Sequence, residues 1–122
     1  MTTTEVLKTN IGEKCTVIAV PAVHVSIAGA TAEVASYVHV VVKHPDSDTV
    51  NYYEILVEKW EAEVKGDELQ RRITRAAERA HAYAQGYIDA LQMLQKLGVE
   101  VSFRGGLANK SWLPEWLQRL LG

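Results

Sequence analysis

The feature that most constrains the fold is a single long helical pattern from Asp67 to Leu97. Asp67 and Gln70 have the spacing of a capping box at its start, and Gly98 is a typical helix stop. At about 100° per residue, one broad apolar stripe follows this pattern. We expect the stripe to pack on a β-sheet, because the chain before Asp67 is rich in β-forming residues. The stripe consists of Ile73, Ala76, Ala77, Ala80, Tyr83, Ala84, Tyr87, Leu91 and Leu94.

The residues before the helix predict four β-strands. The first two are Lys14–Val20 and Val23–Ala28, and Pro21 is expected at a bend or an edge between them because proline cannot donate to a ladder. The third and fourth are Glu33–Val42 and Val50–Trp60, joined by a turn rich in Pro, Asp and Ser. This second pair is expected to form a long antiparallel hairpin.

Strict alternation divides the fourth predicted strand into two faces. The expected core face carries Tyr53, Ile55 and Val57. The opposite face is expected to be half exposed to solvent, and it carries Tyr52, Glu54, Leu56 and Glu58.

Two further elements are expected after the long helix. Val99–Phe103 predicts a short strand, and Ser111 can cap a final helix with an apolar stripe of Leu113, Trp116, Leu117 and Leu120. The whole order predicts an α+β fold, in which a mainly antiparallel four- to five-stranded sheet is packed by one long helix (67–97) and a short C-terminal helix (112–121). Residues 1–10 are expected to form a flexible N-terminal segment and 11–122 a single domain, because 122 residues with 48% hydrophobic content can bury one core.

This order of elements, over Lys14 to Leu121, is similar to the ribonuclease H-like fold. A degenerate ribonuclease H-like arrangement is therefore the alternative architecture. The resemblance implies metal-binding carboxylates on the first strand, on the long helix and after the fourth strand. The first predicted strand has no carboxylate between Thr16 and Val20, and only Glu78 would lie on the helix, so nuclease chemistry is not expected.

Composition and charge exclude several broad classes of protein. The formal net charge of −2 gives no global field that would attract nucleic acid or an anionic membrane. Cys15 is the one cysteine, which excludes an intrachain disulfide and a multi-cysteine metal site and is typical of a reducing, cytoplasmic setting. The stretch from Cys15 to Ala32 has no acidic, lysine or arginine residue, but Pro21, His24 and many β-formers indicate strands rather than a membrane span.

The histidines have both functional and structural interpretations. His44, Asp46 and Asp48 share one loop and carry groups that ligate divalent cations, but Pro, Asp and Ser are ordinary turn residues, so no metal is predicted. His24 and His39 lie on neighbouring predicted strands. They are either a pH-sensitive pair or two histidines whose hydrogen bonds are satisfied within the fold.

The remaining candidate groups favour structure over chemistry. Cys15 would be a nucleophile only with a base beside it, and its apolar neighbours favour an inert buried thiol. Gly105 and Gly106 follow a predicted strand, with Arg104 and Lys110 nearby, but they lack a phosphate-loop fingerprint and indicate a turn. The sequence therefore shows no catalytic constellation, predicts no cofactor and favours a protein that is not an enzyme.

The outward face of the long helix is divided into two parts. Its first half is rich in arginine and is predicted to bind a partner, and its second half is small and nearly uncharged and is predicted to mediate self-association. Glycine costs about 1 kcal/mol relative to alanine inside a helix, so the glycine in the second half indicates close approach by a second copy or by another element of the fold. The partner-binding residues are Arg71, Arg72, Arg75 and Arg79, and the self-association residues are Ala82, Gly86 and Met93.

These features predict a protein-interaction module, an adaptor or inhibitor of a larger assembly, that docks through the outward helix face. Its expected partner is an acidic protein surface or the protein itself, as a homodimer or higher oligomer, and no membrane partner is expected. One alternative is a nucleic-acid-binding accessory protein that uses the helix arginines on phosphates and exposed tyrosines such as Tyr52 for stacking. The other is a small-molecule binder whose pocket lies between sheet and helix, lined by Tyr83, Tyr87, His24 or His39.

Overall fold

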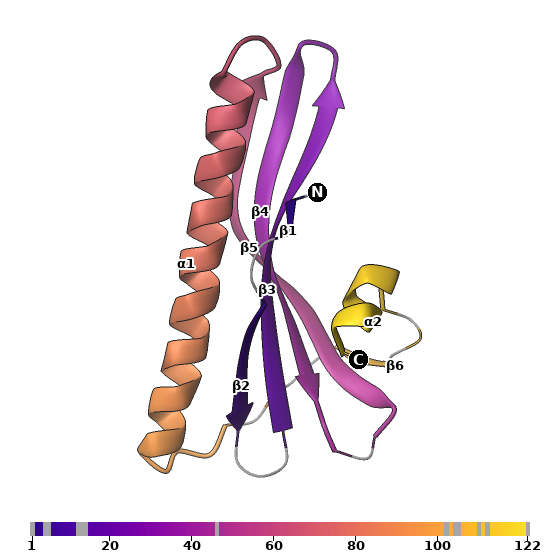
Figure 1. Ribbon diagram of the computed structural model, residues 1–122, viewed down its shortest axis with the longest axis vertical. Coiled ribbons are helices and arrows are strands. Elements are labelled where there is room, and N and C mark those ends of the chain that lie inside the picture. Colours follow the sequence, from indigo (N-terminus) through magenta and orange to yellow (C-terminus); the bar gives the residue numbers. More distant parts are fainter. Residues whose placement is uncertain are drawn as a thin grey trace.

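The computed structural model of the chain describes residues 2–3, 6–11, 15–45, 47–101, 103, 106–109, 111 and 113–121. In this part of the chain, every strand pairing is antiparallel, and the strands form one twisted sheet between a long helix and a short one (Figure 1). The predicted α+β class is confirmed, with its antiparallel sheet and its two helices. The elements are β1 (Thr2–Thr3), β2 (Leu7–Ile11), β3 (Cys15–Ala28), β4 (Thr31–Lys43), β5 (Thr49–Glu63), α1 (Glu68–Lys96), β6 (Leu107–Asn109) and α2 (Glu115–Leu121).

The centre of the sheet is made of the three long strands β3, β4 and β5. β3 continues through Pro21, so the predicted break between a first and a second strand is wrong. Pro21 pairs with Val38 of β4 on one side. On the other side, Val20 and Pro21 lie between the stretch paired with β2 and the stretch paired with β1. β3 thus keeps its pairing with β4 across Pro21, although proline cannot donate to the ladder.

The described N-terminal residues contribute two strands, β1 and β2. β2 pairs with β3 along its whole length, and β1 pairs with β3 further along the same edge. Leu7 and Ile11 pack against the core under α1, and Thr9 is buried. The Nε2 amide group of Gln92 on α1 donates to Thr9 Oγ1 at 3.3 Å. Alternation of Leu7, Thr9 and Ile11 toward the core explains why this polar-looking stretch is ordered within 7–11.

A β-bulge changes the facing of β5 halfway along the strand. Tyr37 pairs with Leu56, but its neighbour Ser36 pairs with Glu58, which leaves Val57 as an extra residue on β5. Before the bulge the odd-numbered residues of β5 pack toward α1, and beyond it the even-numbered residues do. The prediction that Glu58 shares a face with Tyr52 is therefore wrong, because one inserted residue reverses the alternation.

The helix α1 runs along the length of the sheet (Figure 1), close to its predicted bounds. Its buried residues are Ala76, Ala80, Ala84, Ile88 and Leu91. Tyr83, predicted to face the sheet, is 45% exposed. The buried face of α1 is rotated slightly from the predicted one, so that it includes Ile88 and not Tyr83. The predicted capping box is also wrong in part, since the Asp67 side chain makes no capping hydrogen bond.

The C-terminal part differs most from the prediction. Val99–Phe103 was expected to be a strand, but residues 99–101 and 103 have no strand structure, and Val101 and Phe103 instead pack against the core under α1. β6 follows and pairs antiparallel with β5. Within the described residues, the strand directly after the helix that a ribonuclease H-like arrangement requires is therefore not formed.

The short helix α2 covers the face of the sheet opposite α1. It begins at Glu115 rather than at 112, because Pro114 O accepts the first helical N–H groups, those of Leu117 and Gln118. Leu113 and Leu117 are buried against a second core on that face. Among the residues that the structure describes, no helix has the length and apolar character needed to cross a membrane.

Candidate functional site

The arginines of α1 gather around one tryptophan at the flank between α1 and β5. The Cζ atoms of Arg72, Arg75 and Arg79 lie 4.6, 5.2 and 5.6 Å from the ring centroid of Trp60. Trp60 faces α1 because it lies beyond the bulge. A guanidinium group within about 6 Å of an indole ring is attracted to its π-system. Part of the arginine pattern that predicted a partner surface is therefore explained by contacts within the chain.

Carboxylates neutralise part of the same cluster. Glu68 accepts hydrogen bonds from Arg72 at 2.9 Å and from Arg71 at 3.1 Å, and Arg79 pairs with Glu58. The bonds from Arg72 and then Arg71 lower the pKa of Glu68 below its usual range. Exposed ion pairs of this kind add little stability, but they reduce the positive charge that the helix presents.

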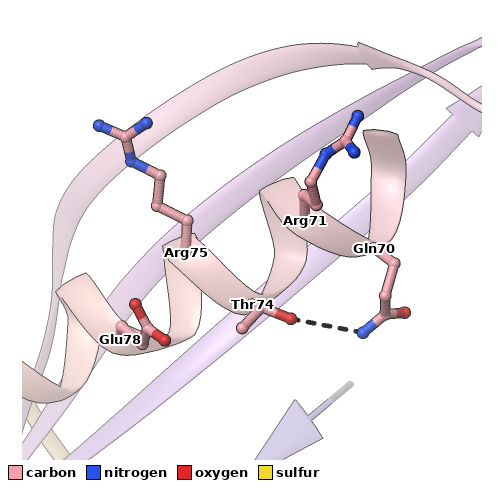
Figure 2. A pocket seen from close by; sticks show the side chains of 5 residues that line it. All are labelled: Gln70, Arg71, Thr74, Arg75 and Glu78. Carbon is pink, nitrogen blue, oxygen red and sulfur yellow. Dashed lines mark hydrogen bonds between the residues drawn. The ribbon is translucent and has the colours of Figure 1, made fainter. Parts of the chain in front are cut away.

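Arg71 and Arg75 line the depressions on the outer surface of α1. Two shallow depressions lie on the outer surface of α1, with volumes of about 390 and 320 Å³, and both are lined by Arg71 and Arg75. In Figure 2 both guanidinium groups extend away from the helix, beside Gln70, Thr74 and Glu78 of the larger depression. Of the four predicted partner-binding arginines, these two line both depressions and are called the outward pair, although Arg75 also lies over the Trp60 ring. Arg72 and Arg79 lie toward β5.

The predicted self-association residues lie on the exposed part of α1. Ala82 and Gly86 are exposed, and Met93 is 63% exposed. Apart from the adjacent backbone of α1 itself, no described atom lies within 4 Å of the position that a Cβ atom would occupy on Gly86. The close approach that Gly86 predicts is thus not supplied by any described element of the same chain, and association with a second copy stays a prediction.

On the opposite face of the sheet, His24 and His39 do meet. Their Nε2 atoms lie 3.4 Å apart, and His39 Nδ1 lies 3.0 Å from the hydroxyl group of Tyr52. The Tyr52 hydroxyl donates to Glu54 Oε1 at 2.9 Å. His39 is buried at 2% exposure and also contacts the Trp116 ring of α2 edge-on, at 5.2 Å between centroids. The chain of four polar side chains runs from exposed His24 to exposed Glu54 through a buried centre.

The direction of the hydrogen bonds along these four side chains determines which ring nitrogen of His39 carries the proton. Because the Tyr52 hydroxyl donates to Glu54, it must accept from His39, so Nδ1 carries the proton and Nε2 accepts from His24. Burial lowers the pKa of His39 below 6.5; the carboxylate of Glu54 opposes this shift and His24 adds to it. Burial raises the pKa of Tyr52 above its ordinary range, and the hydrogen bond to Glu54 adds to the rise.

The tyrosines of α1 do not join these histidines. Tyr83 and Tyr87 lie on the α1 side of the sheet, whereas His24 and His39 lie on the α2 side. The hydroxyl groups of Tyr87 and Tyr53 contact each other between α1 and β5. One pocket lined by all the predicted residues is therefore not formed.

A third cluster, at the end of the sheet where β3 begins and β4 ends, brings together Cys15, His44 and Asn51. Cys15 Sγ lies 3.4 Å from His44 Nδ1, and His44 Nε2 lies 2.7 Å from Asn51 Oδ1. Cys15 and His44 are half-buried, and Asn51 is 7% exposed. Cys15 was expected to be an inert buried thiol without a base, and the fold supplies the base.

Strand register explains this cluster and shows what signal was available for it. β3 and β4 pair through Thr16 and Lys43, and one further step of the same register puts Cys15 opposite His44. Asn51 pairs with Val42, two residues before His44 on β4. If Cys15–Ala28 is taken as one strand, the hairpin register counted from the turn at Gly29 places Cys15 opposite His44.

The other predicted ligand groups have structural surroundings or lie outside the described residues. Asp46, Arg104, Gly105 and Lys110 are not described. Gly106 has φ of 45°, and a Cβ atom there would lie 2.0 Å from Tyr52 O, so the backbones of Gly106 and β5 approach too closely for any side chain. Among the described residues, no group of three or more His, Cys, Asp or Glu side chains is placed to hold a metal ion.

Comparison with known proteins supplies no further guide. No protein-family model, curated protein or solved structure matches this chain. Three arrangements of side chains are the candidate sites: the outward arginine pair, the His24–Glu54 chain and the Cys15 cluster.

Proposed function

We propose that this protein is an interaction module, an adaptor or inhibitor of a larger assembly, that docks an acidic protein surface on the outward face of α1. The observation that supports this function is the outward pair Arg71 and Arg75, which lines both depressions on that face. A guanidinium group presents a planar fork of N–H donors that matches a carboxylate. Two such forks one helical turn apart fit a pair of acidic side chains on a partner.

An acidic protein surface fits this face better than nucleic acid does. The carboxylates of Glu58, Glu68 and Glu78 are interspersed among the helix arginines. A phosphate backbone binds through many contacts of one sign, and each carboxylate within such a footprint repels it. A protein partner can instead place single acidic groups opposite Arg71 and Arg75 and its own basic groups opposite Glu78.

The docking proposal is tested with the double variant Arg71→Glu plus Arg75→Glu, used as bait in the lysate of the native host. We expect one discrete protein bound by the natural chain to be lost. Titration of that purified partner should then show affinity weakened at least about a hundredfold, because removing each of two charge-assisted pairs costs about 1.5 kcal/mol or more. The measurement is isothermal calorimetry at two salt concentrations.

The matched control is Lys96→Glu plus Arg119→Glu, which makes the same change in net charge at exposed positions away from the two depressions. It should keep the partner. Equal loss in the control would show that the effect is one of net charge and would contradict docking at Arg71 and Arg75. Retention of a nucleic acid by the natural chain at low salt, and its loss in the docking variant alone, would favour the nucleic-acid alternative.

We further propose that the module acts in a reducing, cytoplasmic compartment and self-associates through Ala82, Gly86 and Met93. The exposure of these three residues supports the second part of this proposal. The molar mass in solution at rising concentration tests it. A mass that stays at 13.5 kDa would contradict self-association, and Met93→Lys should abolish any dimer that forms.

A further inference from the structure

The Cys15, His44 and Asn51 side chains form an ordered sequence of hydrogen-bonding groups. Asn51 Oδ1 can only accept, so His44 Nε2 carries the imidazole proton and donates it at 2.7 Å. The lone pair of His44 Nδ1 is then left facing Cys15 Sγ at 3.4 Å. The nitrogen nearest the thiol is thus held in the form that accepts a proton. A nucleophile, a base within reach and a third group that orients the base are the arrangement by which thiols are activated in unrelated folds.

The geometry points to a second function at this end of the sheet: we propose that Cys15 is a nucleophilic thiol that accepts an acyl group from an activated acyl donor, a thioester or an aryl ester. His44 is the base, and Asn51 is a positioning residue that acts through His44. The inference is independent of docking on α1. It changes the expectation that the chain has no catalytic constellation, because the three residues are 29 and 7 positions apart in the sequence and are joined only by strand pairing.

The reaction balances with the groups present. The S–H proton of Cys15 moves to His44 Nδ1 as the sulfur forms a bond to the acyl carbon. The bond from that carbon to its leaving sulfur or oxygen breaks, and His44 Nδ1 returns the proton to the leaving group. The products are S-acyl Cys15 and a free thiol or phenol. Water then attacks the acyl carbon, gives a proton to His44, and displaces Cys15, which recovers its hydrogen, while a carboxylic acid leaves.

Burial and position are consistent with this role. Cys15 and His44 are each half-buried, so a small electrophile can reach the sulfur while apolar residues of the core lie behind it. Reactive cysteines are found in partly exposed surroundings with a base, whereas a fully enclosed cysteine is inert. Asn51 is buried, which fixes the amide that holds the imidazole in place.

The first test is the rate at which iodoacetamide alkylates Cys15 in the full chain at pH 7. We expect the natural protein to react faster than the same protein unfolded in urea, and His44→Gln to lower the native rate at least about tenfold. Asn51→Ala should lower it as well, and Asn51→Asp should restore it because a carboxylate can accept the same N–H. The control His24→Gln, a histidine on the opposite face of the sheet, should leave the rate unchanged.

The same rates at about pH 10 separate base action from mere access to the sulfur. Solvent hydroxide ionises a thiol at that pH without help from a histidine. The differences among natural protein, His44→Gln and Asn51→Ala should therefore vanish at high pH. Differences that persist would mean that the variants only change exposure of Cys15, and the proposal would be overturned.

The second test uses p-nitrophenyl acetate as the acyl donor. The natural protein should release a burst of p-nitrophenol equal to one molecule per chain and should carry one acetyl group on Cys15 by mass spectrometry. Cys15→Ser should lose the burst, and His44→Gln should slow it at least about tenfold. Native Cys15 that reacts no faster than in the unfolded chain, with no burst and no effect of His44→Gln, would disprove the thiol centre and leave the docking proposal standing.

Discussion

Two histidines of this protein have both ring nitrogens engaged, yet they are held in opposite forms. His39 carries its proton on Nδ1, because the Tyr52 hydroxyl that it meets is already donating to Glu54. His44 carries its proton on Nε2, because it meets the amide oxygen of Asn51. In each case the tautomer is decided by the third group and not by the imidazole itself.

The difference teaches that a neighbour's chemistry, more than a histidine's own burial, decides what the histidine can do. The Nε2 lone pair of His39 accepts a hydrogen bond from a second imidazole, so it is used within the chain of four side chains. The free lone pair of His44 faces a thiol, which becomes a nucleophile when it loses its proton. We expect the first site to matter mainly for stability and its pH dependence, and the second mainly for reactivity.

Truncation of each histidine gives the largest expected contrast. His39→Ala should lower the free energy of unfolding by about 2–3 kcal/mol, because it opens a cavity beside Trp116 and leaves Tyr52 without its donor. His44→Ala, at a half-buried position, should cost about 1 kcal/mol. Urea unfolding followed by tryptophan fluorescence measures both. Equal losses in the free energy of unfolding for the two variants would contradict the expectation that His39 contributes more to stability than His44.

The next effect is the pH dependence of stability. The folded-state pKa of His39 lies below 6.5, so the unfolded chain binds a proton that the folded chain does not. The contribution of neutral His39 to the free energy of unfolding is complete above pH 6.5. It is lost as the pH falls below 6.5, with a slope of up to about 1.4 kcal/mol per pH unit. The groups facing His39 are His24, Tyr52, Glu54 and the uncharged Trp116 and Tyr37 rings.

Unfolding titrations between pH 7.5 and pH 5 in the natural chain and in His39→Gln measure that slope. The variant should have the flatter profile over this range, and the difference should persist in high salt because His39 is buried. A natural protein that gains stability on acidification would show that the attraction of Glu54 outweighs burial, which reverses the sign.

The smallest expected effect is at the hydroxyl group of Tyr52. Tyr52→Phe removes the bridge between His39 and Glu54 and should cost about 1 kcal/mol of stability, because a buried N–H loses its acceptor. It should leave the alkylation rate of Cys15 at its natural value, since Tyr52 faces away from α1 and His44 faces toward it. A changed rate would mean that the two histidine sites are coupled through β5.

Local patterns in the sequence predicted the parts of the fold that depend on neighbours along the chain. The helix α1 and the β4–β5 hairpin have strong periodicity and clear turn residues, and both were predicted close to their bounds. β3 was divided at Pro21 because proline normally interrupts a strand, and nothing in the local sequence shows that Pro21 pairs with Val38 within one continuous strand. The strand expected over 99–103 has the right alternation, but its described residues, 99–101 and 103, form no strand.

The sites were harder to predict because they depend on register. The pattern of arginines was visible, but the bulge that turns Trp60 and Glu58 toward them was not, so Arg72 and Arg79 were grouped with the outward pair. His24 and His39 were identified as neighbours without the knowledge that they meet. Cys15, His44 and Asn51 were missed as a set, since each has an ordinary structural interpretation until two hairpins align them.

The bulge at Val57 has a consequence for protein design. The bulge divides β5 into two segments. The residues that face α1 are odd-numbered in the segment before the bulge and even-numbered in the segment after it. The two segments can be redesigned under separate rules, and changes beneath the arginines need not disturb the end that holds Asn51. If the bulge formed at Lys59 instead of Val57, Glu58 would face the α2 side of the sheet, and Trp60 would still face α1. The position of the bulge in β5 therefore determines whether Glu58 can pair with Arg79.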